Sequence, residues 1–322
     1  MSTTTLARPL PRTLRADWRG QADGLLPVLA LVAMLGFATV VEPRSLSYTG
    51  LTLLLASALP LVLAAISQMF IIMAGDIDLG TGYLVGLTNA VAARYLTGDW
   101  WFALVMYAGL VVLYMLAAAL VELRGVPSII VTLGASFVWL GTALLVLPTP
   151  GGKAPVSLQA FFIAEPPLIP LPVLLCVAIG VLAYLLSVRM PYSAVIRGLG
   201  SNALALNRSG RSALKARVTC YGLAAVFGIL AGLAVTGLTA SGDANASANI
   251  TLLAIAAVIL GGGDFAGGRA VPFGAVTGAL AISLVTSVLA LFNVSSDYQT
   301  AVQGLILLLV LAGRIVIRKV EA

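Results

Sequence analysis

Long runs without a single charged residue are the feature that most restricts how this chain can fold. The runs cover residues 24–41, 45–75, 100–121, 125–152, 166–188, 218–242, 244–263 and 270–296. A bilayer core of about 30 Å is crossed by about 20 apolar residues in a helix, and most of the runs reach that length. Strands of a membrane barrel would instead alternate in polarity, which runs such as LPVLLCVAIGVLAYLL do not. The pattern predicts an all-α, polytopic membrane protein.

The composition excludes several kinds of chemistry. Only 9% of the residues are charged and 60% are apolar, and the chain has no histidine and two cysteines. Histidine is the commonest metal ligand and a frequent general base, and no Cys/His spacing suggests a metal site. The single GGK, at 151–153, lacks the upstream glycine and the following Ser/Thr of a phosphate-binding loop. We therefore expect no metal site, no cofactor and no enzymatic activity in this chain.

A pass along the chain predicts about ten membrane-spanning helices. The expected spans are 24–41, 51–74, 79–93, 100–121, 126–148, 170–188, 218–240, 250–263, 271–292 and 298–313. Pro60 lies inside the second span and should kink or divide it, because proline removes a helix hydrogen bond. The spans at 79–93, 250–263 and 298–313 are the weakest, and each fits a broken or re-entrant helix as well as a full crossing.

The positive charges predict the orientation of the chain. Residues 189–217 carry six Lys or Arg and no acid, and residues 1–23 and the tail 314–322 are also basic. Positive loops mark the cytoplasmic side of a membrane protein. We expect a cytoplasmic N-terminal segment (1–23), a transmembrane domain (24–313) with a cytoplasmic loop at 189–217, and a cytoplasmic tail. We therefore attribute the net charge of +6 to the orientation of the protein in the membrane and not to nucleic-acid binding.

Two acids interrupt one of the most apolar parts of the chain, IIMAGDIDLGTG at 71–82. A carboxylate in the bilayer core costs roughly 2.5–3.5 kcal/mol, so it should face the bundle interior or a polar cavity. Either acid could simply hold the start of the next helix, which we favour for each acid taken alone. For the motif as a whole we favour a hinge beside the translocation path. Its residues are Gly75, Asp76, Asp78, Gly80 and Gly82.

A weaker copy of this motif follows 188 positions later. FIIMAGD is echoed by VILGGGD, and Asp264 falls on Asp76. We read this as a possible internal repeat, because transporters are often built from repeats with broken helices at the repeat interface. The hinge prediction therefore extends to Gly263, Asp264, Gly267 and Gly268.

The basic loop contains a segment with its own start and stop signals. Asn202 can cap a short helix that runs through Arg208 and ends at Gly210. One interpretation is a basic linker that lies near anionic membrane lipid. The other is a short helix that docks into a soluble partner.

Four motifs, in order, resemble those of one family. AGDIDLGTG resembles GGIDLSxG, VPSIIVTLG (126–134) resembles PxFIVTLG, RGLGSNALALNRSG (197–210) resembles GxNxxAAxxSGI, and LGGGDFAGGRAVPFGAVTGA (260–279) resembles LGGxSxxGGxGxxxG. The chain is similar to the permease subunit of bacterial ABC importers for monosaccharides, of the ribose/xylose/arabinose type. Asp76, Gly80, Gly263, Asp264 and Ala266 depart from the family pattern, which leaves the solute open.

The resemblance implies several partners. They are a cytoplasmic ATPase with tandem nucleotide-binding domains that binds ATP and Mg, a periplasmic solute-binding protein, and a second permease subunit, identical or different, in the bacterial inner membrane. The 197–210 segment would be the part inserted into the ATPase. Its expected contact residues are Arg197, Gly200, Asn202, Ala203, Ala205, Arg208, Ser209 and Gly210.

Two other functions remain open on the sequence. A proton-coupled secondary transporter could use Asp76, Asp78 or Asp264, since membrane acids often relay protons. An intramembrane enzyme ranks last, because no nucleophile–base pair is identifiable. Import by alternating access, powered by a separate subunit, is the leading hypothesis.

Overall fold

The computed structural model describes residues 18–292, 294–295, 298–299, 301–302 and 304–305. Within this part the regular structure is helical, apart from one isolated bridge between Gly151 and Gly242. The prediction of an all-α, polytopic membrane protein is confirmed. The expected tail, most of the N-terminal segment and most of the span at 298–313 lie outside the described residues.

The helices follow the uncharged runs. In chain order they are α1 (Trp18–Val41), α2 (Tyr48–Ala56), α3 (Leu59–Met73), α4 (Thr81–Tyr95), α5 (Trp100–Arg124), α6 (Ser128–Val146), α7 (Val156–Phe162), α8 (Leu171–Tyr184), the π-helix η1 (Leu185–Arg189), α9 (Ser193–Arg208), α10 (Ala213–Thr239), α11 (Ile250–Leu260) and α12 (Pro272–Leu291). Five of the described helices are long and apolar enough to cross a membrane: α5, α6, α8 with η1, α10 and α12.

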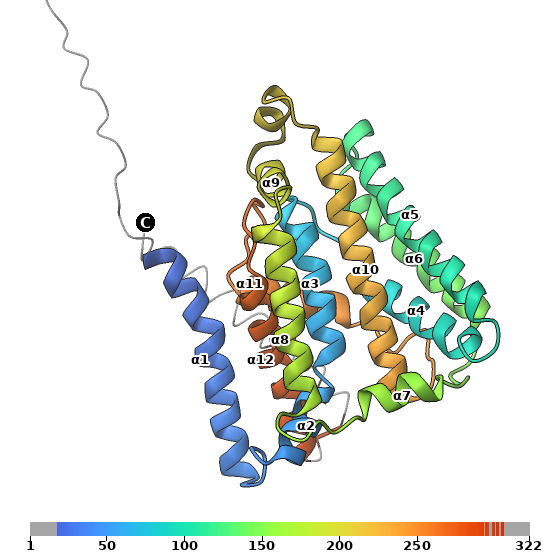
Figure 1. Ribbon diagram of the computed structural model, residues 1–322, viewed down its shortest axis with the longest axis vertical. Helices are drawn as coiled ribbons and strands as arrows, with labels where there is room; N and C mark the ends of the chain where they lie inside the picture. The colour runs from blue at the N-terminus through green and yellow to red at the C-terminus, as the bar shows by residue number, and fades with distance from the viewer. Residues whose placement is uncertain (1–17, 293, 296–297, 300, 303, 306–322) are drawn as a thin grey trace, which may run out of the picture.

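The bundle has two distinct ends (Figure 1). The α9 helix projects at one end, and α2 and α7 lie at the other. We call these the α9 end and the α7 end. The α1 helix stands at the side of the bundle, next to α12.

Pro60 divides the second expected span, as predicted. It lies in the first turn of α3, where its missing N–H has no helical acceptor to lose. The α2 and α3 helices are bent by 48° at the break, and together they form a sixth candidate span.

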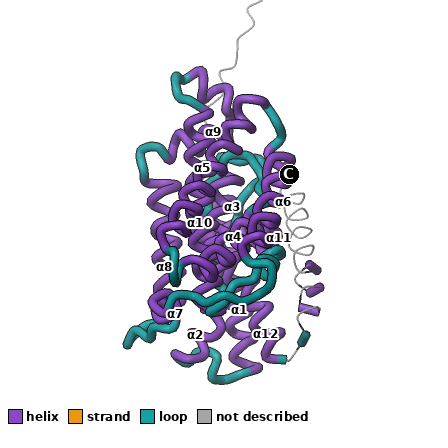
Figure 2. The backbone as a smooth tube through the Cα atoms, turned by 90° about the vertical axis from the view of Figure 1, so that its right-hand side faces the viewer, coloured by secondary structure: helices purple, strands orange, loops and turns teal. Residues whose placement is uncertain are grey.

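The α3 and α4 helices occupy the centre of the bundle (Figure 2). Every residue of α3 is buried, and α4 exposes only its last turn and part of Tyr83. A helix that is apolar on all sides is stable only when other helices surround it. The α10 helix packs along α3, α4 and α5 and so ties the centre to the periphery.

Two of the expected spans, 79–93 and 250–263, form helices that are too short to cross a bilayer alone. With a rise of 1.5 Å per residue, α4 is about 22 Å long and α11 about 16 Å. The α4 helix begins beside the middle of α10, where a Cβ on Gly228 would touch Leu84. Gly82 N, in the first turn of α4, donates to Thr251 Oγ1 in the first turn of α11 (2.8 Å). The two helices therefore start at the same level and run toward opposite ends of the bundle.

Candidate functional site

Three segments with irregular or kinked backbone meet at the α9 end. They are the stretch between α3 and α4 (74–80), the loop between α11 and α12 (261–271), and α9 itself. All three contain residues that the sequence marked as hinge or docking residues. Their contacts decide which of those residues act together.

Asp76 forms a buried ion pair. Its Oδ2 is bonded to Arg217 Nη1 from α10 and accepts from Tyr221 Oη (3.2 Å). Arg217 Nε also donates to Glu122 Oε2 of α5 (2.8 Å). Only 8% of the Asp76 side chain and 13% of the Arg217 side chain is exposed. The expectation that Asp76 holds a helix start is wrong, because a buried carboxylate needs a charged partner and α10 supplies one.

Asp78 holds the start of α4, as expected for an acid in this position. It is fully buried, and its Oδ1 accepts from the backbone N–H of Gly80 (2.6 Å). Its Oδ2 accepts from Thr81 Oγ1 (2.7 Å) and from Tyr114 Oη of α5 (3.0 Å). Charge-assisted hydrogen bonds of this kind and the positive end of α4 together stabilise the carboxylate.

The α6 helix accepts hydrogen bonds from the backbone N–H groups of the irregular stretch before α4. Ile77 N donates to Ser128 Oγ (3.2 Å), and Leu79 N donates to Thr132 Oγ1 (3.1 Å). Without water, non-helical backbone is stable in a membrane bundle only when protein groups replace the missing bonds. Two hydroxyls of the VPSIIVTLG segment therefore support the interruption before α4.

Gly80 and Gly82 allow close approach of other backbones. A Cβ on Gly80 would lie 3.2 Å from the carbonyl oxygen of Thr132. A Cβ on Gly82 would lie 2.5 Å from the carbonyl oxygen of Ser247, in the irregular segment before α11. The two interrupted segments thus touch at the first turn of α4.

The second motif forms a turn nearer the surface. Asp264 is partly exposed, its Oδ1 accepts from Ala266 N (3.2 Å), and its carbonyl accepts from Gly267 N (3.0 Å). Gly263 closes the end of α11, with its N–H bonded to the carbonyl of Val258 (2.8 Å). The contact to the first motif is through backbone, since Gly268 N donates to the carbonyl of Met73 (2.9 Å).

The α9 helix is two helices joined at Asn202, whose φ of −168° and ψ of 95° are extended. Asn202 Oδ1 accepts from Ala205 N (2.9 Å), and the second helix ends before Gly210, which has a φ of +78°. The predicted capped helix is confirmed. Before the kink, Val195, Ile196 and Leu199 are buried.

The residues expected to dock into a partner fall into two groups: those after the kink are mostly exposed, and those before it contact the bundle. Asn202, Ala205, Arg208, Ser209 and Gly210 are exposed, and Ala203 is partly buried. Arg197 instead donates to the carbonyl of Ser187 in η1 (2.5 Å) and to Ser193 Oγ (3.2 Å). Gly200 packs against the bundle. The projecting part is therefore 202–210.

Sequence reasoning missed the partners of the acids. Arg217 and Tyr221 lie 141 and 145 residues from Asp76 in the chain, and Tyr114 lies 36 residues from Asp78. The small number of charged residues could have indicated these partners. A buried acid requires a cation, and Arg217 directly precedes an apolar run.

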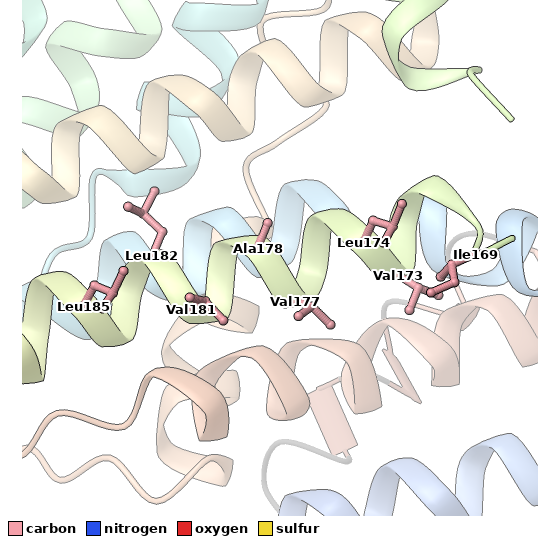
Figure 3. A pocket seen from close by; sticks show the side chains of 8 residues that line it. All are labelled: Ile169, Val173, Leu174, Val177, Ala178, Val181, Leu182 and Leu185. Carbon is pink, nitrogen blue, oxygen red and sulfur yellow. The ribbon is translucent and has the colours of Figure 1, made fainter. Parts of the chain in front are cut away.

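A hollow of about 490 Å³ lies along α8 (Figure 3). All eight lining residues are aliphatic: Ile169, Val173, Leu174, Val177, Ala178, Val181, Leu182 and Leu185. It offers no hydrogen-bonding side chain for a polar solute, so we do not count it as part of the candidate site.

A family model described as "Branched-chain amino acid transport system / permease component" matches residues 50–311 of the chain. This range contains both acid motifs, α9 and every partner residue described above. No solved structure matches the chain significantly.

Curated relatives match over nearly the full length. The chain is 28% identical to the ribose import permease protein RbsC of Bacillus subtilis over 301 residues, which cover 92% of this chain and 94% of the relative. It is 27% identical to the D-allose transport system permease protein AlsC of Escherichia coli K12, covering 87% of each chain. It is 25% identical to the autoinducer 2 import system permease protein LsrD of Klebsiella pneumoniae, covering 94% of this chain and 92% of the relative.

Proposed function

Because this chain belongs to the family of branched-chain amino acid transport system permease components, we propose that it is the membrane subunit of an ATP-driven importer. Its cargo is a monosaccharide or a related polar solute. The observation that carries the ATP-driven part is the projecting helix 202–210. It is capped by Asn202, carries the exposed cation Arg208 and follows Gly200, which packs against the interrupted segments at the α9 end. Such a helix gives a separate motor subunit a place to act.

The proposed substrate class follows the relatives and not the family title. That title names branched-chain amino acids, whereas the relatives that match nearly the whole chain are named for ribose, D-allose and autoinducer 2. Full-length similarity compares the whole bundle, so we give it more weight. The particular solute is left to a transport assay.

In this proposal the α9 end faces the cytoplasm of a bacterial cell and the protein lies in the inner membrane. The support is the positive-inside rule, because residues 189–217 carry six cations and no acid. The first turn of α1 points toward the α9 end (Figure 1), which supports the proposal that the N-terminal segment is cytoplasmic too. Ten crossings, the number expected from the sequence, return the C-terminus to the cytoplasmic side.

The proposed partners divide between the two ends. An ATPase with tandem nucleotide-binding domains contacts residues 202–210 and holds ATP and Mg²⁺, so this chain needs no cofactor of its own. A solute-binding protein delivers cargo at the α7 end. A second permease subunit, identical or different, completes the path within the lipid bilayer.

Transport in this scheme is alternating access without covalent chemistry. The hinge comprises the backbone interruptions around Gly75, Gly80, Gly82, Gly263, Gly267 and Gly268. Asp78 keeps α4 attached to α5 through Tyr114, and Asp76 keeps the hinge attached to α10 through Arg217. These contacts let α4 move as one unit with its neighbours.

Reconstitution tests the proposal. Proteoliposomes that contain this chain, its ATPase and its binding protein are loaded with ATP on the cytoplasmic side and supplied with radiolabelled D-ribose or D-allose. We expect uptake of at least one sugar only when all components and ATP are present. Uptake by this chain alone, or uptake that needs a proton gradient and no ATP, overturns the proposal and favours a proton-coupled transporter.

Charge reversal tests the docking surface. Arg208→Glu with Arg211→Glu should prevent the ATPase from stimulating uptake, since both cations are exposed at the α9 end. Arg124→Glu is the control, because this exposed cation ends α5 and lies outside residues 202–211. Equal loss in both variants would show a general charge effect and not docking.

A further inference from the structure

Three glycines from distant parts of the chain meet at one point at the α9 end. Gly75 follows α3, Gly200 lies in the buried half of α9, and Gly267 lies in the loop before α12. A Cβ built on Gly267 would lie 2.8 Å from the Cα of Gly75 and 3.0 Å from the Cα of Gly200. A Cβ on Gly75 would lie 3.8 Å from the Cα of Gly200. We call these three residues the glycine junction.

The junction is a contact between backbones with no side chain in it. A Cβ on Gly200 would overlap the carbonyl oxygen of Met73 and the amide nitrogen of Gly268. These same two atoms already share a hydrogen bond of 2.9 Å. Gly75 and Gly267 have φ values of +82° and +79°, which side chains strongly disfavour.

The junction lies directly next to the projecting helix. Gly200 is two residues before Asn202, where the exposed part of α9 begins. The half of α9 before the kink is held by buried Val195, Ile196 and Leu199. A displacement of residues 202–210 therefore reaches Gly200 through two peptide units.

The other two glycines of the junction lie in the irregular segments that lead into α4 and α12. Gly75 is followed by Asp76–Gly80, the irregular stretch that leads into α4. Gly267 follows α11 and precedes α12 by five residues. Packed side chains absorb small shifts by changing rotamer. Here no rotamers exist, so a shift of Gly200 must move the backbones of Gly75 and Gly267.

We propose that the glycine junction transmits the movement of the ATPase-contacting segment 202–210 to the interruptions before α4 and before α12. This inference rests on the proposed function, since it presumes an ATPase at that segment. It goes further by assigning Gly200 a positioning role in coupling, which is distinct from contact with the ATPase.

Hydrogen exchange on the complete complex in nanodiscs tests the inference. Amide exchange is compared with and without ATP plus vanadate, which traps the ATPase. In the wild type we expect nucleotide-dependent changes in residues 202–210, 73–80 and 262–270 together. A change confined to 202–210 in the wild type overturns the inference, whatever the variants do.

Two glycine variants of α9 make the test sharper. Gly200→Ala should still bind the ATPase and still change at 202–210, but should lose the changes at 73–80 and 262–270. Its ATP-driven uptake of D-ribose or D-allose, whichever sugar the wild type transports, should fall at least about fivefold, the lower range of measured coupling effects. Gly198→Ala is the control, because its Cβ would meet only the flexible end of the Leu206 side chain at 3.3 Å.

The outcomes separate the two hypotheses. If no ATPase binds the wild type, the proposed function fails. If the ATPase binds and powers uptake but Gly200→Ala keeps the changes at 73–80, the transmission role alone fails. If Gly200→Ala does not fold, the wild-type exchange pattern still decides.

Discussion

The two glycine–acid turns at the α9 end share a pattern but use their acids differently. Each follows an apolar helix and contains a glycine in the left-handed region, Gly75 with φ +82° and Gly262 with φ +96°. In the first turn, the carboxylates of Asp76 and Asp78 are buried and bonded to side chains of other helices. In the second, the carboxylate of Asp264 accepts from Ala266, in its own turn, and is partly exposed.

The difference shows that burial and not sequence pattern decides what an acid does. A buried carboxylate loses its hydration and depends on fixed donors from elsewhere in the fold. A partly exposed carboxylate keeps contact with water and can serve a local turn. What the two turns share in the structure is their glycine backbone, which packs at one point.

The largest expected effect is removal of the cation beside the first turn. Arg217→Gln leaves Asp76 and Glu122 without their ion-pair partner and should lower the free energy of unfolding by about 3–5 kcal/mol. Unfolding by SDS titration in mixed micelles measures this. Adding Asp76→Asn should restore part of the loss. Near wild-type stability of Arg217→Gln would contradict the importance given to this ion pair.

Removal of Asp78 should have the next largest effect. Asp78→Ala leaves the N–H of Gly80 and the hydroxyls of Thr81 and Tyr114 without their acceptor and should cost about 1–3 kcal/mol. The same titration applies. Asp78→Asn keeps one carbonyl acceptor and should be closer to the wild type. Equal losses in both variants would show that the charge, and not the hydrogen bonds, matters.

Removal of one donor to Asp78 should cost less. Tyr114→Phe deletes a single hydroxyl and keeps the ring, which stacks on Trp139 at a centroid distance of 5.9 Å. We expect a loss of about 1 kcal/mol in the free energy of unfolding. Tyr107 lies on the same helix as Tyr114 and donates to the Thr88 carbonyl of α4, so Tyr107→Phe is a control for loss of a tyrosine hydroxyl.

The smallest expected effect is in the second turn. Asp264→Ala should change the free energy of unfolding by only about 0.5 kcal/mol, because the side chain is partly exposed and water reaches its carboxylate. If Asp264→Ala lowers the free energy of unfolding as much as Asp78→Ala does, the two turns do not use their acids differently.

The helices could be predicted from the sequence because bilayer-length apolar runs leave little choice. The α5, α6, α8, α10 and α12 helices start and end within a few residues of the expected spans, although α10 begins five residues earlier. The break at Pro60 and the cap at Asn202 were also predictable, because each depends on local backbone chemistry.

The side-chain contacts of the site could not be predicted, since they join distant segments. Nothing near Asp76 in sequence indicates Arg217, and nothing near Ile77 indicates Ser128. The sequence leaves 241–249 between two expected spans but does not indicate that this segment contacts the first turn of α4. The meeting of Gly75, Gly200 and Gly267 appears only once three separate turns are packed together.

The shared starting level of α4 and α11 also has an electrostatic consequence. Each helix carries the equivalent of roughly half a positive charge at its first turn, and the two first turns are linked by the bond from Gly82 to Thr251. Their sum is about one positive charge, and Asp78, adjacent to the first turn of α4, supplies one negative charge. The dipoles of two helices, and not of α4 alone, therefore favour a negative charge at the carboxyl group of Asp78.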